Sequence, residues 1–137
     1  MNVFLDTSCL VSFFISDAHH EKAKMVRDRI LQRENKGLIS ALSLVELCGV
    51  VRRNRGEAEA KQVKNAIEDI AEKELLSIIP ISNFDASLAS DLTISTGLMG
   101  ADAVIVSAAK QSKAELVTFD EEIKKKAKGI IEFYETG

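Results

Sequence analysis

The sequence predicts an α/β protein in which a parallel sheet is covered by helices on both faces, giving three layers. Short apolar segments alternate along the chain with longer segments whose apolar residues recur at helical spacing. This alternation is typical of parallel sheets, whose strands are buried on both faces. The chain has 137 residues and no repeat or Pro/Ser-rich linker, so we expect a single domain.

The first half of the chain is expected to form two strands and four helices. Residues 2–6 are mainly apolar and end on an acid, and Ala23, Val26 and Ile30 recur at helical spacing after Asp17. The expected elements are a strand at 2–6, a helix beginning within 9–15, a helix capped by Asp17 and running to about residue 34, a strand at 37–40, and helices at 41–53 and 57–73.

The second half is expected to continue the alternation and to end on a strand. Gly97 and Gly129 each follow a helical pattern and are expected to end it, because glycine readily adopts the left-handed conformation found after helices. The expected elements are a strand at 75–81, a helix capped by Asn83 or Asp85, an apolar helix at 101–110, a strand at 115–119, a basic helix at 121–128 and a strand at 130–134.

The composition narrows the class of protein. Hydrophobic residues make up 46% of the chain and charged residues 28%, as in ordinary globular domains. The formal net charge is −3, which provides no overall attraction for nucleic acid. No apolar run approaches the ~20 residues of a membrane span and no signal peptide is evident, so we expect a cytoplasmic protein without membrane contact. Cys9 and Cys48 are expected to be small buried side chains.

Four acidic residues occupy unusual positions for a charge. Asp6 and Asp120 directly follow expected strands, and ligand sites in parallel sheets collect beyond the carboxyl ends of the strands. Glu46 is the only charge in ALSLVELCGVV, and Asp102 is the only charge in GADAVIVSAA. Because acids are rarely buried without a partner or a metal, these positions indicate a functional site.

Each acid alone also has a structural explanation. Asp6, Asp102 and Asp120 could cap neighbouring helices, and Glu46 could belong to a solvent-facing stripe with Ser43 and Arg53. Four carboxylates at one edge of a sheet repel one another, however, and a bound cation relieves that repulsion at neutral pH. Oxygen ligands without His or Cys suit Mg²⁺ or Mn²⁺, ions that promote phosphodiester hydrolysis.

Four segments carry a family resemblance. VFLDTSCLVSFF, SALSLVELCGVV, GADAVIVSAAK and ELVTFD, in this order, resemble the PIN domain, and most of all the compact VapC-type toxins of prokaryotic toxin–antitoxin pairs. The resemblance covers essentially the whole chain, so one PIN domain is expected over residues 1–137. It implies a five-stranded parallel sheet and a Mg²⁺- or Mn²⁺-dependent endoribonuclease acting on RNA. It also implies a homodimer and a cognate antitoxin.

The resemblance assigns the catalytic and metal-binding roles to the four acids Asp6, Glu46, Asp102 and Asp120. Asp6 and Asp102 are expected to be the core ligands of the ion. Many family members place a further acid and then Phe after the last of these acids, but here Ile follows Glu122. Glu122 is therefore an alternative or additional ligand beside Asp120.

Two nearby hydroxyls are candidates for supporting roles. Ser8 and Thr118 lie close in sequence to Asp6 and Asp120, where they could position water or a carboxylate. Taken separately, Ser8 and Thr118 would more often be ordinary turn and strand residues than supporting groups.

Other functions fit the sequence less well. A stand-alone PIN nuclease that processes RNA without an antitoxin is compatible with the same motifs, whereas a non-catalytic PIN-fold binding module is disfavoured because all four acids are present. A haloacid-dehalogenase phosphatase requires Asp-x-Asp after the first strand, where this chain has Asp6-Thr7-Ser8. A receiver domain requires adjacent acids at that position.

Basic and aromatic residues are less informative. Arg52, Arg53, Arg55, Lys110, Lys113 and Lys124 to Lys126 follow the acidic motifs and could either flank an RNA site or form an ordinary solvated surface. His19 and His20 are expected only to flank the start of a helix. No aromatic platform for stacking bases is evident, which favours recognition of RNA by its shape or backbone.

Overall fold

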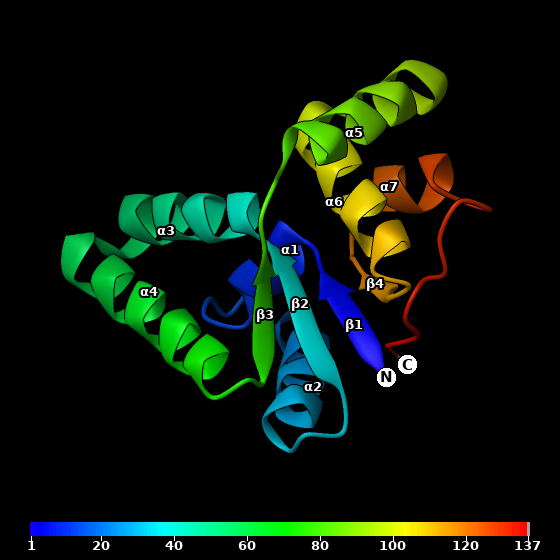
Figure 1. The fold of residues 1–137 in the computed structure, drawn as a ribbon. Coiled ribbons are helices and arrows are strands. Elements are labelled where there is room, and N and C mark those ends of the chain that lie inside the picture. Colours follow the sequence, from blue (N-terminus) through cyan, green and yellow to red (C-terminus); the bar gives the residue numbers. More distant parts are fainter. Residues whose placement is uncertain (137) are drawn as a thin grey trace.

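The computed structural model describes residues 1–136 and has four parallel strands. These are β1 (Asn2–Leu5), β2 (Lys36–Ser40), β3 (Leu76–Ile79) and β4 (Glu115–Val117), which lie side by side in the order β3-β2-β1-β4. The central strand β1 pairs with both neighbours, so that Val3 lies opposite Gly37 on one side and Glu115 on the other. The predicted α/β fold with a parallel sheet is confirmed (Figure 1).

Seven helices of residues 1–136 cover the two faces of this sheet (Figure 1). They are α1 (Thr7–Ser12), α2 (His20–Leu31), α3 (Ala41–Arg55), α4 (Glu57–Glu72), α5 (Asn83–Thr96), α6 (Gly100–Gln111) and α7 (Glu121–Lys126). Helices α1 to α4 contribute to the core on one face, and α5 to α7 contribute to the core on the other. The three predicted layers are therefore present.

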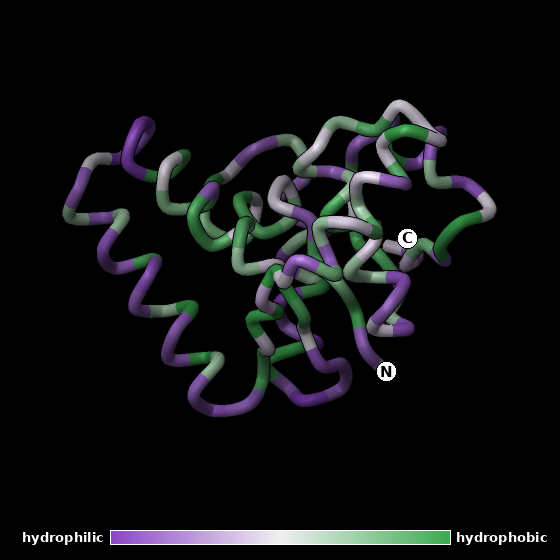
Figure 2. The backbone as a smooth tube through the Cα atoms, turned by 45° about the horizontal axis from the view of Figure 1, so that its top comes forward, coloured by the Kyte–Doolittle hydropathy of each residue, from purple (hydrophilic) through white to green (hydrophobic). Residues whose placement is uncertain are grey.

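Strand β1 supplies side chains to both cores because successive residues of a strand point to opposite faces. Val3 and Leu5 lie in the core with α1 to α4, while Phe4 lies in the core with α5 to α7, and all three are fully buried. In Figure 2, hydrophobic residues recur along α4 among hydrophilic ones, as expected for a helix with one packed face. Cys9 is buried as predicted, whereas Cys48 is only half-buried.

The prediction of a fifth strand at 130–134 is wrong. In the described residues this segment makes only an isolated parallel bridge to β4, between Leu116 and Phe133. The Leu116 N–H donates to the Glu132 carbonyl at 2.9 Å, and the Tyr134 N–H donates to the Leu116 carbonyl at 2.9 Å. Because β4 has three residues and alternate residues face each edge, only Leu116 offers its backbone groups to this side. Over residues 1–136 the sheet therefore has four strands.

Two predicted helix caps are also wrong. Helix α2 begins at His20, and Asp17 instead accepts hydrogen bonds from the Ser12 hydroxyl at 2.8 Å and from the His19 backbone N–H at 2.9 Å. Asp17 thus connects the last residue of α1 with the residue that precedes α2. Helix α5 is capped by Ser82, whose hydroxyl accepts from the Asp85 backbone N–H at 3.1 Å.

The predicted glycine at the end of α5 is confirmed. Gly97 follows Thr96 with φ of 76°, a left-handed conformation in which a β-carbon is disfavoured. None of the helices in residues 1–136 is by itself long and apolar enough to cross a membrane, although α5 and α6, bent by 114°, pass the same test of length and composition as a pair.

Candidate functional site

Asp6 lies at the end of the central strand and begins helix α1 as its N-cap. Its side chain is only 3% exposed, which is rare for a carboxylate. One oxygen, Oδ1, accepts hydrogen bonds from the Ser8 hydroxyl at 2.7 Å and from the Cys9 backbone N–H at 2.8 Å. The other, Oδ2, accepts from the hydroxyl of Thr118, which follows β4. These three donors fix the carboxylate at the carboxyl edge of β1 and β4.

The pKa of Asp6 is raised above its ordinary value of 3.8. Burial is the main cause, and the nearby charge of Asp120 acts in the same direction. The hydrogen bonds from Thr118, Cys9 and Ser8 lower the pKa but do not fully offset burial. The surroundings of Asp6 therefore disfavour its charged form, and a nearby cation would stabilise that form.

Glu46 on α3 faces α1. Its Oε1 accepts a hydrogen bond from the Thr7 hydroxyl at 2.8 Å, and the Thr7 oxygen lies 2.9 Å from the hydroxyl of Ser43. Ser43 is fully buried, whereas the adjacent Val45 is 69% exposed, so the solvent-facing stripe considered for Ser43 and Glu46 is wrong. The role of Thr7 was not predicted, because its contact with Glu46 spans 39 positions of the sequence.

Asp102 lies in the first turn of α6, three residues after the N-cap Met99. It is half-buried, and burial is the main cause that raises its pKa. The charges of Asp120, Asp6 and Glu46, in decreasing order, raise this pKa further. All four predicted acids therefore lie within one electrostatic neighbourhood.

Asp120 and Glu122 have different surroundings. Asp120 is the N-cap of α7, and its Oδ1 accepts from the backbone N–H groups of Glu122 at 2.8 Å and Ile123 at 3.3 Å. Glu122 is exposed and lies 2.7 Å from the ammonium of Lys126, which lowers the pKa of Glu122. Its partner is thus a lysine, whereas the charge of Asp120 acts on Asp6 and Asp102.

The acids do not form a closed ligand set. Within residues 1–136, no three His, Cys, Asp or Glu side chains lie in a group that could hold one metal ion. The acids nevertheless fit a hard cation chemically, since their donors are carboxylate oxygens and two of them have raised pKa values. Asp6 and Asp102 are the acids whose burial such an ion would compensate.

One lysine belongs to this neighbourhood. The Lys126 ammonium donates to the Gly97 carbonyl at 3.2 Å, joining α7 to the end of α5, and its charge lowers the pKa of Asp102. The sequence predicted only that lysines 124 to 126 form a basic group. The contact with Gly97 singles out Lys126.

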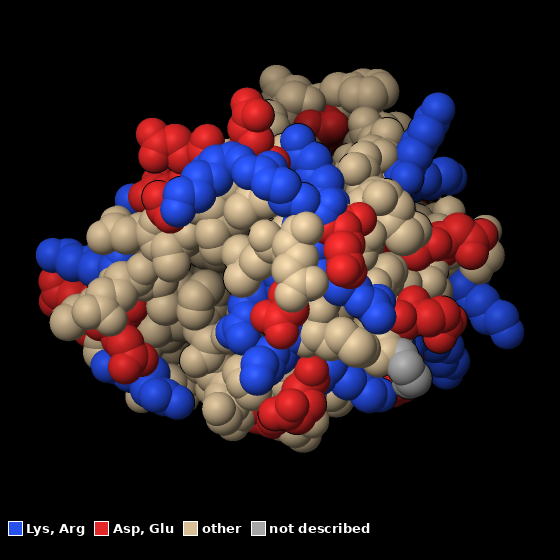
Figure 3. Space-filling model, turned by 90° about the horizontal axis from the view of Figure 1, so that it is seen from below, with Lys and Arg blue, Asp and Glu red and all other residues tan. Residues whose placement is uncertain are grey.

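Two of the other predicted basic residues lie elsewhere. Lys110 and Lys113 line a hollow beside Met1 and Asn2, at the amino edge of β1, so they do not flank the acids. The three arginines at the end of α3 are exposed. Figure 3 views the molecule from the side where the strands begin, and there basic and acidic side chains are interspersed. His19 and His20 flank the start of α2 as predicted.

The PIN domain family model matches residues 3–129. No curated protein matches the chain. Three similar solved structures share 16–22% of its sequence, a level at which the likeness shows the fold alone.

Two of these structures contain a toxin with its antitoxin. A toxin–antitoxin complex from Klebsiella pneumoniae has a TM-score of 0.68 at 21% identity, and 98% of each chain is covered. VapBC2 from Rickettsia felis, bound to a DNA fragment from its promoter, has a TM-score of 0.70 at 22% identity with the same coverage. The third is VapC20 of Mycobacterium tuberculosis, described as a sarcin–ricin loop cleaving toxin. It has a TM-score of 0.70 at 16% identity, with 90% of this chain and 93% of that chain covered.

The burial of Asp102 and its repulsion by the other acids predict that Asp102→Asn changes the stability of the protein in a pH-dependent way. The folded-state pKa of Asp102 is raised, so its charge destabilises the metal-free fold above that pKa and ceases to do so as the pH falls below about 3.8. The substitution should therefore raise the free energy of unfolding at neutral pH, and with it the melting temperature. The gain in free energy should be no more than about 1 kcal/mol, because water screens a half-exposed charge.

Thermal melts in EDTA at neutral and acidic pH measure this effect. Asp91→Asn, which changes an exposed acid on α5, is the matched control and should show no such difference. If Asp102→Asn raised the melting temperature equally at both pH values, the charge of Asp102 would not be what destabilises the fold.

Proposed function

The chain belongs to the PIN domain family, and from that premise we propose that it is a divalent-metal-dependent endoribonuclease that hydrolyses RNA phosphodiester bonds. The observation that carries the proposal is the convergence of Asp6, Glu46, Asp102 and Asp120 at the carboxyl edge of the sheet, where the charges of the other three raise the pKa of Asp102. The description of one structural neighbour as a toxin that cleaves the sarcin–ricin loop supports RNA as the substrate.

Asp6 and Asp102 would be the core ligands of Mg²⁺ or Mn²⁺. When bound, the ion supplies Lewis-acid activation of water and stabilisation of the leaving oxygen. Glu46 would hold a second ion or orient the attacking water, and Asp120 would bind the ion directly or through water. The products expected from the family resemblance carry a 5′-phosphate and a 3′-hydroxyl.

Neighbouring residues would hold these acids in their working orientation. Ser8, Thr118 and the Cys9 backbone N–H occupy both oxygens of Asp6, so this carboxylate can turn little. The Thr7 hydroxyl orients Glu46 by the same kind of bond. Such supporting hydrogen bonds to metal ligands typically change metal affinity or activity by about tenfold to a hundredfold.

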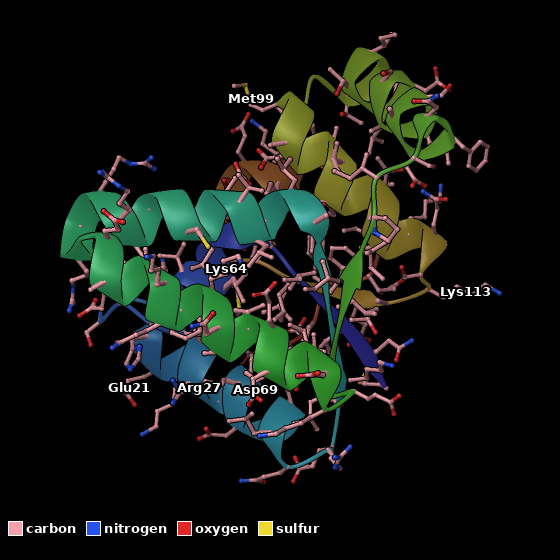
Figure 4. The ribbon with its side chains drawn as sticks, turned by 60° about the vertical axis from the view of Figure 1, so that its left-hand side comes forward. Glu21, Arg27, Lys64, Asp69, Met99 and Lys113 are labelled. Carbon is pink, nitrogen blue, oxygen red and sulfur yellow. The ribbon has the colours of Figure 1, made fainter. Side chains whose placement is uncertain are left out.

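We propose further that the protein is the toxin of a VapBC-type pair, that it forms a homodimer, and that it acts in the cytoplasm. Structural neighbours described as toxin–antitoxin complexes support an antitoxin partner. Exposed large apolar side chains offer surface for protein partners, and they include Val45 on α3, Ile94 on α5 and Met99 before α6. Figure 4 shows Met99 projecting outward from the start of α6.

Asp6→Asn should abolish cleavage of RNA. The substitution removes a ligand charge, so cleavage is expected to fall by more than about a hundredfold, in line with the several kcal/mol that a bound ion supplies. The melting temperature should stay the same or rise, since Asp6 is a buried acid with a raised pKa. Gel assays on total RNA with Mg²⁺ or Mn²⁺ measure cleavage, with Asp91→Asn as the control. Wild-type rates in Asp6→Asn would overturn the assignment.

Metal binding should be detectable without any activity assay. Mn²⁺ or Mg²⁺ at about 100 times its Kd stabilises a protein by about 2.7 kcal/mol when it binds only the folded state. We expect a rise in melting temperature for the wild type that saturates with metal and is absent from Asp6→Asn. Equal shifts in both proteins would place the ion elsewhere.

Paired substitutions on α7 separate Asp120 from Glu122. Asp120→Asn preserves the helix cap, because Asn is as good an N-cap as Asp, but it removes a charge that acts on Asp6 and Asp102. We expect about tenfold to hundredfold slower cleavage. Glu122→Gln should leave the rate within about twofold, because its charge is already paired with Lys126 and exposed. The reverse order of effects would make Glu122 the ligand.

A further inference from the structure

A stacked pair of rings lies next to the carboxyl edge of the sheet that carries Asp6, Glu46, Asp102 and Asp120, called the acidic edge below. The rings of His19 and Phe119 are parallel to within 5°, and their centroids are 4.6 Å apart. Phe119 stands in the sequence between Thr118, which donates to Asp6, and Asp120, so its Cα is about 3.8 Å from the Cα of each. No aromatic platform is evident in the sequence, because these two rings come from segments that are far apart in the chain.

One ring of the His19–Phe119 stack is anchored and the other is open. Phe119 is half-buried and packs against the core of the α1 to α4 face. His19 is exposed, so it forms the outer layer of the stack with surface left to solvent. An offset stack of this kind can be extended by a further planar ring.

The backbone that carries His19 is held in place from inside the protein. Ser12 is 1% exposed, and its hydroxyl donates to Asp17 at 2.8 Å. Asp17 in turn accepts the backbone N–H of His19 at 2.9 Å, and the Nδ1 of His20 lies 2.7 Å from the Ser12 carbonyl oxygen. The His19 ring is therefore carried by a hydrogen-bonded turn between α1 and α2, which reduces the entropy lost when a ligand stacks on the ring.

We propose that the His19–Phe119 stack holds one nucleobase of single-stranded RNA beside the acidic edge. This inference rests on the proposed nuclease function and adds a substrate contact to it. Proteins bind unpaired bases by stacking them on aromatic side chains, and this contact tolerates any base. With a net charge of −3, the protein lacks a general attraction for phosphates, so a local stacking contact would supply affinity that its charge does not.

The binding test uses His19→Ala and single-stranded RNA in EDTA, so that nothing is cleaved. The His19 side chain makes no cap hydrogen bond to α2, so its removal should leave the melting temperature unchanged. RNA affinity should fall about tenfold, within the range reported for one base stacked on an aromatic ring. His19→Phe keeps a flat ring and should retain affinity. Phe84→Ala, which removes an exposed ring on α5, is the matched control.

RNA oligonucleotides with one abasic nucleotide at successive positions around the cleaved bond identify stacking itself. At one position, removal of the base should lower the RNA affinity of the wild type by the same factor as His19→Ala lowers the affinity for intact RNA. The two changes combined should lower the affinity no more than either change alone. With metal present, His19→Ala should raise KM for intact RNA and leave kcat unchanged. Losses that add at every position would overturn the stacking contact.

The remaining outcomes separate this inference from the nuclease itself. Wild-type RNA affinity in His19→Ala, together with cleavage that depends on Asp6, would reject the platform and leave the nuclease proposal intact. If His19→Ala weakens binding of a protein partner but not of RNA, the stack belongs to a protein interface and the inference is wrong. A wild-type protein that neither binds nor cleaves RNA would reject both.

Discussion

The buried carboxylate of Asp6 is the constraint on which the carboxyl edge of the sheet depends. A charge in this position is unfavourable unless hydrogen bonds replace the water it has lost. Its donors come from two places, the first turn of α1 and Thr118 after β4. The bonds that make burial of Asp6 tolerable therefore also join β1, α1 and the chain after β4. Loop, helix and strand are held in one arrangement by a single charged group.

The rest of the acidic edge adds electrostatic cost to this arrangement. Glu46 lies on α3 and is bound by the Thr7 hydroxyl of α1. Asp102 lies in the first turn of α6, and Asp120 is the N-cap of α7. Repulsion within this group raises the pKa of Asp102 beyond what burial alone causes. A protein selected only for stability would not keep such a cluster, and functional sites are where stability is commonly given up. In the proposed function the bound cation restores part of what is lost.

Local patterns in the sequence predicted the strands and the acids, because each is recognisable from its immediate neighbours. Continuous apolar segments identified β1 to β4, and Glu46 was conspicuous as the lone charge in an apolar helix. Features that depend on distant contacts were missed. The prediction of a fifth strand was wrong because only one residue of β4 offers its backbone groups to the outer edge. The Thr7–Glu46 bond and the His19–Phe119 stack were not predicted because they form only when the chain is folded.

The charge distribution argues for recognition through a few short contacts. A protein with a net charge of −3 cannot draw in RNA by its overall field, and on the face seen in Figure 3 its basic side chains are interspersed with acidic ones. Lys110 and Lys113 lie at the opposite edge of the sheet, and Lys126 is already engaged with Glu122 and Gly97. In the proposed function, the charge of a bound ion and the open face of the His19–Phe119 stack would lie beside the acids. One attracts a phosphate and the other a base, so together they would position a single nucleotide of the substrate against Asp6 and Asp102.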